Sequence, residues 1–308
     1  MATAATTTTR LIGSRPWWYA FRRGRWLGYV YGGPVIIAFL VFNLYPMLLG
    51  LYLSFTSWDI LRPPTFIGLR NWIDLLSDEL LGRALLQTLY YAVVSVAGAT
   101  VLSIALALLL NQRLKTIGFY RTFFFLPAVT SLVAIAMVWR WIYNTEFGVL
   151  NAFLGSLGIN PVNWLGDPVL AMPAVILMSI WRSAGFNTVL FLAGLQGVPQ
   201  EYYEAAEIDG ASRWDRLWHI TLPLISPTTF FVVVNGLIGS WQVFDQVYIL
   251  TRGGPLLSTV TVVYLIYSNG FEWYKTGYAS AMAYALFLII IVLTSIQFVL
   301  QKRWVFYN

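Results

Sequence analysis

The chain has 308 residues with a formal net charge of +6, and 58% of the residues are hydrophobic while only 10% are charged. Its mean hydropathy is +0.69, and so few polar side chains cannot cover an ordinary soluble domain, so the composition excludes that class and places the chain in a bilayer. The absence of cysteine also excludes disulfides, thiolate nucleophiles and cysteine-ligated metal sites.

Residues 1–27 are predicted to form a retained cytoplasmic tail. A run of threonine and alanine is followed by five arginines among tryptophans, and no small-residue cleavage site follows a short apolar core, as a signal peptide would require. Elsewhere the basic residues cluster at the ends of apolar segments. This placement favours contact with anionic lipid over binding to nucleic acid.

Six apolar segments are long enough, at about 20 residues or more, to cross a membrane as helices. They are residues 28–54, 84–110, 119–143, 169–195, 224–250 and 277–300. The tail and the loops on its side hold about twice as many lysines and arginines as the opposite loops, so the positive-inside rule predicts cytoplasmic termini. The predicted fold class is all-α integral membrane, with residues 28–308 forming one six-helix domain.

A polar island, Glu201–Pro223, separates the fourth and fifth apolar segments. Pro199 suits the beginning of a helix and no breaker lies within Gln200–Asp209, so a short helix is predicted there. Gly210 is expected to end it. The pair Ser212 and Asp215 has the spacing of a capping box and begins a second short helix, which is expected to run to about Thr221 and to meet Pro223 at the foot of the next apolar segment. The island is therefore predicted to be a helix–glycine–helix elbow.

The island resembles the EAA loop of binding-protein-dependent ABC importer permeases, and it keeps that family's spacing over residues 199–223. The matching residues are Glu204, Ala205, Ala206, Asp209, Gly210, Ile220, Leu222 and Pro223. In that family the loop is a coupling helix that sits in a groove of a separate ATP-hydrolysing subunit. The alternative is an amphipathic hairpin on the inner membrane surface, which has no need of this glycine and proline spacing.

Three further segments resemble sugar importer permeases. The stretch Phe244–Pro255, FDQVYILTRGGP, is similar to one half of the heterodimeric permease typified by maltose and glycerol-phosphate importers. Phe66–Trp72 and Gly148–Leu165 resemble the outer scoop segments of such permeases, although an aromatic belt at the lipid headgroups also explains the tryptophans. The extra helices and large outer domain of the maltose-type subunit have no counterpart, so the compact six-helix form is the better match.

The resemblance implies a transport subunit of the plasma (inner) membrane of a bacterium or archaeon. Its expected partners are a second homologous permease, two ATP-binding subunits and an extracytoplasmic solute-binding protein. ATP and Mg²⁺ would bind the ATPase subunits, and no cofactor is expected on this chain. The family's commonest solute class is carbohydrate, with glycerol phosphate or a related polyol phosphate as the alternative. An ion-coupled secondary transporter would be expected to carry an inverted repeat, and no convincing one is visible.

The residues themselves argue against an enzyme. No phosphate-binding G-x-x-x-x-G-K-[ST] loop occurs, and His219 is the only histidine, so neither a nucleotide cradle nor a metal site is predicted. Within the apolar segments the clear ionisable side chains are Arg182 and Asp245. Neither a carboxylate pair nor a nucleophile with a base is present there.

A polar stripe on the fifth apolar segment is predicted to line the solute pathway. Its members recur at helical spacing, and amides can both donate to and accept from sugar hydroxyls, while a tryptophan offers a flat face to a sugar ring. The alternative is interhelical packing through small and polar residues. The full predicted set is Asn235, Gly239, Ser240, Trp241, Gln242, Asp245 and Gln246, with Arg182 and Asn187 from the fourth segment.

Overall fold

The computed structural model describes residues 26–112 and 117–306, of which residues 26–30 and 117 are described by their backbone alone. The predicted tail lies, apart from its last two residues, outside the described residues. The chain forms two compact units, residues 1–52 and residues 53–308. The fold is mostly helical, as predicted.

The first unit contains the first predicted span except for its last two residues. Helix α2 covers Trp26–Phe39, and a π-helical turn, η2, covers Leu40–Leu44 and leads into α3, Tyr45–Ser54. The 24-residue stretch Tyr31–Ser54 has a mean hydropathy of 2.1. A stretch that is apolar all round has the composition of a membrane-spanning helix.

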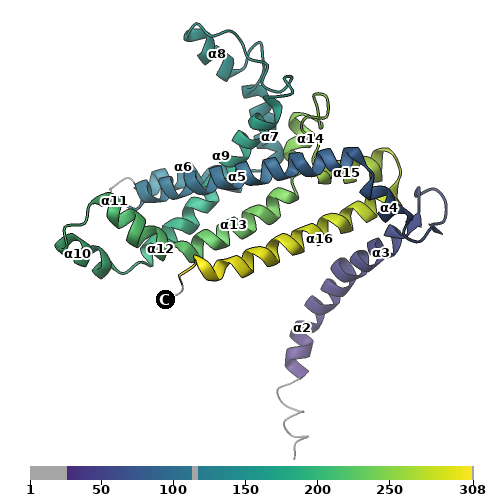
Figure 1. The fold of residues 1–308 in the computed structure, drawn as a ribbon, viewed down its shortest axis with the longest axis horizontal. Coiled ribbons are helices and arrows are strands. Elements are labelled where there is room, and N and C mark those ends of the chain that lie inside the picture. Colours follow the sequence, from purple (N-terminus) through teal and green to yellow (C-terminus); the bar gives the residue numbers. More distant parts are fainter. Residues whose placement is uncertain (1–25, 113–116, 307–308) are drawn as a thin grey trace, which may run out of the picture. The chain divides into compact units, whose positions relative to one another are not determined.

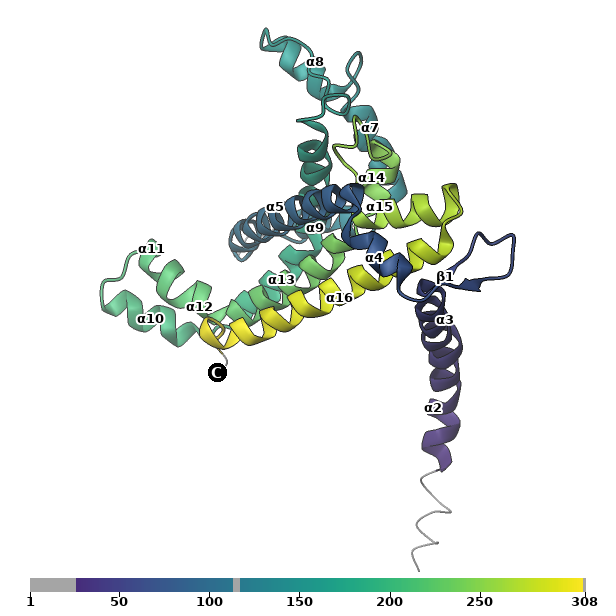
Figure 2. The ribbon, with the colours of Figure 1, turned by 45° about the vertical axis from the view of Figure 1, so that its right-hand side comes forward.

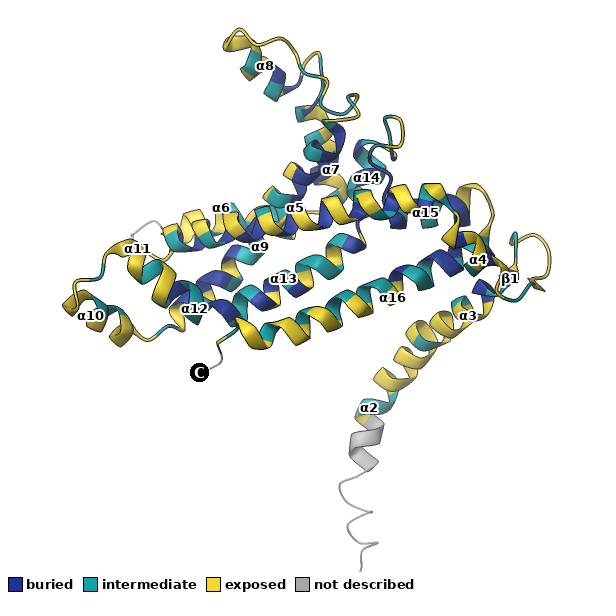
Figure 3. Ribbon diagram, viewed as in Figure 1, coloured by how far each residue is buried: buried dark blue, intermediate teal, exposed yellow. Residues whose placement is uncertain are grey.

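The second unit is built on four long helices. They are α5, Glu79–Leu110; α9, Ala171–Gln196; α13, Ser226–Trp241; and α16, Thr276–Leu300. Helix α9 packs along α5, and α13 contacts α5, α9 and α16 (Figure 1 and Figure 2). Figure 3 shows buried positions recurring along these helices where they face one another.

Small residues allow these helices to approach closely. A Cβ at Gly98 of α5 would lie 2.5 Å from the side chain of Ile180 on α9, and one at Gly185 would lie 2.3 Å from the carbonyl oxygen of Phe124. Interfaces rich in small residues are typical of helices that pack inside a bilayer. The helix contacts therefore depend on side chains that hydropathy alone does not distinguish.

The third predicted span, residues 119–143, is two helices that meet at a bend. Helix α6, Ile117–Val129, and helix α7, Leu132–Ile142, meet at a bend of 100°. The Thr130 hydroxyl donates to the Leu126 carbonyl oxygen at 2.9 Å, and Ser131 takes an extended backbone with ψ of 130°. The helical backbone is interrupted at Ser131, so the apolar run turns although its composition does not change.

The fifth predicted span is also interrupted. A helix that begins at Arg213 bends by 63° before α13, where Ile225 leaves the helix with ψ of 4° and is followed by Pro227 in the first turn of α13. Helix α13 ends at Trp241, and a separate helix, α14, covers Asp245–Leu250. Four described helices are long and apolar enough to cross a membrane, or six if each bent pair is one span.

Short elements complete the second unit. Strands β1, Thr56–Ser57, and β2, Thr65–Phe66, pair antiparallel with Thr56 opposite Phe66. The remaining helices are α4, Arg70–Leu76; α8, Val149–Ser156; α10, Gln200–Ile208; α11, Arg213–Arg216; η3, Leu217–Thr221; α12, Leu222–Leu224; α15, Val262–Tyr267; η4, Ser268–Glu272; and η5, Gln301–Arg303. Helices α10 and α11 lie at the end of the bundle opposite α4 and α15 (Figure 1).

Candidate coupling elbow and solute cavity

The polar island folds as the predicted elbow. Helix α10 begins at Gln200, directly after Pro199, and Asp209 caps its end. Gly210 follows with φ of +78°, a conformation that L side chains rarely adopt. The chain then reverses into α11. Glycine adopts this conformation without steric cost, so the backbone geometry of the corner favours it.

A capping box begins the second arm of the elbow, as predicted. The backbone N–H of Asp215 donates to the Ser212 hydroxyl oxygen at 3.2 Å, and the backbone N–H of Ser212 donates to the Asp215 carboxylate at 3.0 Å. The Ser212 hydroxyl and backbone N–H hold the pKa of the Asp215 carboxyl below its usual range. The capping box therefore sets the beginning of α11 directly after Ser212.

This arm does not end at Thr221, where the sequence placed its end. A π-helical turn carries it on, with the backbone N–H of Leu222 bonded to the Leu217 carbonyl oxygen, and α12 then includes Pro223. A π turn is one way in which a helix accommodates the missing N–H of a proline. Leu222 packs beside the buried Ile225 in a cluster with residues of α5 and α9. The end of the elbow is therefore packed against the helical bundle.

Two contacts tie the arms of the elbow together. The Arg216 guanidinium donates to the Glu207 carboxylate, which joins α11 to α10. The hydroxyl groups of Tyr203 and Thr221 lie 3.1 Å apart and share a hydrogen bond between α10 and η3. These contacts close the elbow on both sides of Gly210 and make it one unit rather than two loosely linked helices.

The surface of the elbow is exposed. Of the predicted coupling residues, Glu204, Ala205, Asp209 and Gly210 are exposed, and Ala206, Ile220, Leu222 and Pro223 are partly buried. Large apolar side chains that the sequence analysis did not select stand beside them, with Ile208 87% exposed and Trp214 71% exposed. Their presence as isolated apolar residues in a polar loop was the feature of the sequence that could have indicated a contact surface. Together they form a mixed polar and apolar surface suited to docking.

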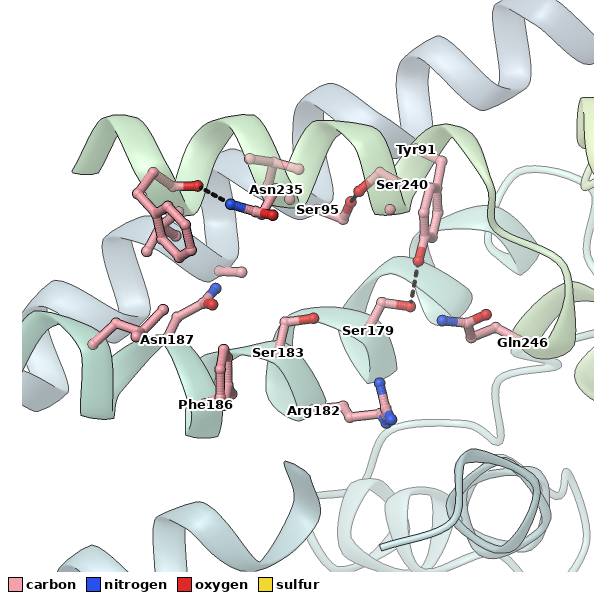
Figure 4. A pocket seen from close by; sticks show the side chains of 17 residues that line it. Tyr91, Ser95, Ser179, Arg182, Ser183, Phe186, Asn187, Asn235, Ser240 and Gln246 are labelled. Atoms are coloured by element: carbon pink, nitrogen blue, oxygen red, sulfur yellow. Dashed lines mark hydrogen bonds between the residues drawn. The ribbon is translucent and has the colours of Figure 1, made fainter. Parts of the chain in front are cut away.

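A cavity of about 540 Å³ lies between α5, α9, α13 and the beginning of α14 (Figure 4). Six of the nine residues predicted for the solute pathway line it: Arg182, Asn187, Asn235, Gly239, Ser240 and Gln246. Asn235 donates from its amide to the Phe231 carbonyl oxygen at 2.9 Å. The two apolar segments that the sequence singled out therefore meet across one cavity.

Trp241, Gln242 and Asp245 do not line the cavity, and the predicted continuous stripe is wrong. Trp241 is only 6% exposed and belongs to a hydrophobic cluster that includes Ala281 and Met282 of α16. Because α13 ends there, Gln246 reaches the cavity from α14 instead of continuing the face of α13. The helix break changes which side chains share a face.

Sequence reasoning missed the hydroxyl groups of the cavity. The Tyr91 hydroxyl donates to the Ser179 oxygen at 2.8 Å between α5 and α9, and the hydroxyl oxygens of Ser95 and Ser240 lie 3.4 Å apart between α5 and α13. Ser183 also lines the cavity. Single hydroxyl residues in apolar segments give no spacing signal until the helices are placed side by side.

Arg182 reaches the cavity from the middle of α9. Within residues 26–112 and 117–306, its buried Nε makes no hydrogen bond, and no ion pair joins it to Asp245 or to another carboxylate. Among the same residues no group of three histidine, cysteine or acidic side chains is placed to hold a metal ion.

A helical membrane bundle with a polar cavity between its spans and an exposed elbow at one end defines a membrane transport subunit. More specifically, the chain belongs to the family described as binding-protein-dependent transport system inner membrane component, which matches residues 99–305. It is accordingly a multi-pass inner membrane component of an ABC importer, a transport subunit and not itself an enzyme. The sequence-based family assignment is confirmed.

Relatives and solved structures cover nearly the whole chain. The probable ABC transporter permease protein YesP of Bacillus subtilis is 36% identical over 94% of each chain. The trehalose/maltose permease MalF of Thermococcus litoralis is 36% identical over 87% of this chain and 91% of its own.

Two crystal structures of bacterial alginate importers share the fold. One, an importer of the acidic polysaccharide alginate, is 28% identical with a TM-score of 0.82, over 93% of this chain and 98% of its own. The other, in complex with a periplasmic protein bound to an alginate pentasaccharide, is 26% identical with a TM-score of 0.83, over 94% and 98%.

Proposed function

We propose that this chain is the permease subunit through which an ATP-driven, binding-protein-dependent importer carries a carbohydrate across the plasma membrane. The observation that carries the proposal is the cavity of about 540 Å³ between α5, α9, α13 and the beginning of α14, in which amides and hydroxyls stand among apolar side chains. The similar proteins named for trehalose/maltose and for alginate support a saccharide as the solute.

The chemistry of the cavity suits a saccharide. Asn187, Asn235 and Gln246 present amides that can donate and accept, as sugar hydroxyl groups require. Phe186 and Phe231 line the same space with exposed aromatic faces, and these replace the buried Trp241 as surfaces for the apolar face of a sugar ring. Polyol phosphate remains the second candidate because Arg182 offers a cation in the same cavity.

The elbow is the proposed contact with the ATPase. The elbow is exposed, its two arms are joined by a hydrogen bond, and its end packs against the bundle. A displacement of α10 would therefore be transmitted to the cavity through α13 and α9. The proposed assembly holds a second homologous permease, two ATP-binding subunits that bind ATP and Mg²⁺, and an extracytoplasmic solute-binding protein. In this arrangement the tail 1–27, the elbow 199–223 and both termini are cytoplasmic, and residues 28–308 form the transmembrane domain.

The test is reconstitution with the neighbouring subunits in liposomes. Uptake of a radiolabelled saccharide is expected only when ATP, the ATPase subunits and the solute-binding protein are all present. Asn235→Leu should lower uptake, because it removes an amide from the cavity, whereas Ile238→Leu on the same helix lies outside the cavity and should not. ATP-independent uptake, or uptake driven by an ion gradient, would remove the assignment.

A further inference from the structure

Arg182 of α9 is a cation that has no carboxylate partner among the described residues. It lies near the middle of α9, its Nε is buried, and within the described residues that nitrogen makes no hydrogen bond and no carboxylate lies within 4.0 Å of the side chain. Charged residues inside a membrane bundle are costly, and they are usually paired or functional. Arg182 therefore presents a positive charge to the cavity with no anion from the described residues beside it.

The cavity itself contains no counter-charge. Helix α5 contributes Tyr91 and hydroxyl groups, α13 contributes an amide and small residues, and α14 contributes Gln246. Asp245 is adjacent to Gln246 in the sequence, but it is exposed and does not line the cavity. Among the described residues, the cavity thus has one formal positive charge and no negative one.

The polar groups are divided between two ends of the cavity. Figure 4 shows the Arg182 guanidinium at the same end as the Gln246 amide and the bonded pair of Tyr91 and Ser179. Asn187 and Asn235 lie toward the other end. One end therefore presents a cation with hydrogen-bonding groups around it, and the other presents neutral amides.

We propose that the carried solute is an acidic saccharide or polyol, whose carboxylate or phosphate binds Arg182 while its hydroxyl groups meet the neutral amides. The inference rests on the proposed transport function and narrows its substrate class. A guanidinium matches the geometry of carboxylate and phosphate oxygens with two parallel hydrogen bonds. A solute with hydroxyl groups alone would be served by neutral donors and would leave the positive charge of Arg182 without an anion.

The first test measures the sign of the potential in the cavity. The chain has no native cysteine, so Ser183→Cys places a single thiol beside Arg182 in the assembled, reconstituted transporter. The modification rates of this thiol by sulfonatoethyl and trimethylammonioethyl methanethiosulfonate are compared by mass spectrometry. We expect Arg182→Gln to lower the ratio of anionic to cationic rates by about tenfold, since opposite reagent charges double the electrostatic effect.

Two variants serve as controls for this ratio. Arg182→Lys keeps the charge and should keep the ratio, whereas Arg140→Gln removes an exposed arginine of α7 that does not line the cavity and should leave it unchanged. An unchanged ratio in Arg182→Gln, or an equal change in Arg140→Gln, overturns the proposal.

The second test asks which molecules protect the thiol. Glucuronate is compared with glucose, and glycerol 3-phosphate with glycerol, at equal concentrations against the Ser183→Cys transporter that keeps Arg182. Slower modification with either acidic probe, and not with its neutral partner, is the expected result, and the probe that protects identifies a carboxylate or a phosphate.

Protection by glucose equal to that by glucuronate overturns the acidic solute while leaving carbohydrate transport intact. Protection by neither acidic probe also overturns it. If in addition Arg182→Gln fails to assemble with the second permease while Arg182→Lys assembles, the charge serves the contact between subunits instead. Failure of the proposed function would differ from all of these, because ATP-dependent saccharide uptake would then be absent.

Discussion

Gly210 lies at the corner between α10 and α11 with φ of +78°, and a Cβ added there meets no atom within 4 Å. The cost of a side chain is therefore conformational, about 1–2 kcal/mol for the left-handed region. Gly210→Val is expected to shift the elbow and lower solute-stimulated ATP hydrolysis in the reconstituted complex. Gly210→Asn should be milder, since asparagine tolerates this region better.

The matched control for this prediction is Gly82→Val in the first turns of α5. That glycine has open space around it and no positive φ, so a side chain adds no left-handed strain. Stimulation by solute should remain in this variant. Wild-type stimulation and wild-type subunit assembly in Gly210→Val would mean that the corner does not matter for coupling.

Trp241 is a residue whose predicted role changes with the structure. Its side chain is packed in the hydrophobic cluster that includes Met282 instead of facing the cavity, so Trp241→Ala should destabilise the folded bundle by about 3–5 kcal/mol. A fall in the melting temperature of the detergent-purified chain would measure this loss. Gln242→Leu, at an exposed position after the end of α13, should leave the melting temperature nearly unchanged. Equal melting temperatures for Trp241→Ala and wild type would contradict the packing.

At the scale of elements, the ion pair between Glu207 and Arg216 makes α10 and α11 one unit. The Glu207 side chain is 63% exposed, so the pair is worth at most about 1 kcal/mol after solvent screening. Glu207→Arg should weaken assembly with the ATPase by placing two cations together. The exchange Glu207→Arg with Arg216→Glu should restore part of it. Pull-down of the ATPase subunits at low and high salt measures both, and no rescue by the exchange would assign the effect to direct contacts with the ATPase.

Elements with continuous apolar composition were predictable from sequence to within a few residues. The predicted segments 84–110, 169–195 and 277–300 correspond to α5, α9 and α16. The elbow was predictable too, because a glycine corner and a capping box are local signals in the sequence. The glycine corner and the capping box each depend only on residues that are neighbours in the sequence.

The breaks inside the other two apolar segments were not predictable from hydropathy. The bend at Ser131 and the end of α13 at Trp241 both lie within apolar runs. Neither changes the average composition of its segment. The end of α13 is why Gln246 was assigned to the cavity for the wrong geometric reason. Ser179 and Ser183 of α9 were missed because single hydroxyl residues give no spacing signal before the helices are placed.

At the scale of the whole molecule, a carrier must expose the two ends of its cavity to water in alternation. In the proposed orientation Asn187 and Asn235 lie toward the cytoplasmic end of the cavity, whereas Ser240 and Gln246 lie toward the outer end. Helix α13 connects this cavity to the elbow, so the nucleotide state of the ATPase should decide which end is open. Movement of the elbow would therefore be transmitted through α13 to the cavity and would change which end of the cavity is open to water.

Single cysteines at these positions test the alternation in the assembled transporter. Asn235→Cys should react with a membrane-impermeant thiol reagent from the cytoplasmic side without nucleotide and lose most of that reactivity in a vanadate-trapped ATP state. Ser240→Cys should respond in the opposite sense from the outer side. Ala281→Cys, at a fully buried position of α16, should stay unreactive in every state. Equal reactivity of Asn235→Cys in all nucleotide states would place the moving pathway elsewhere, since a static cavity cannot exchange its open end.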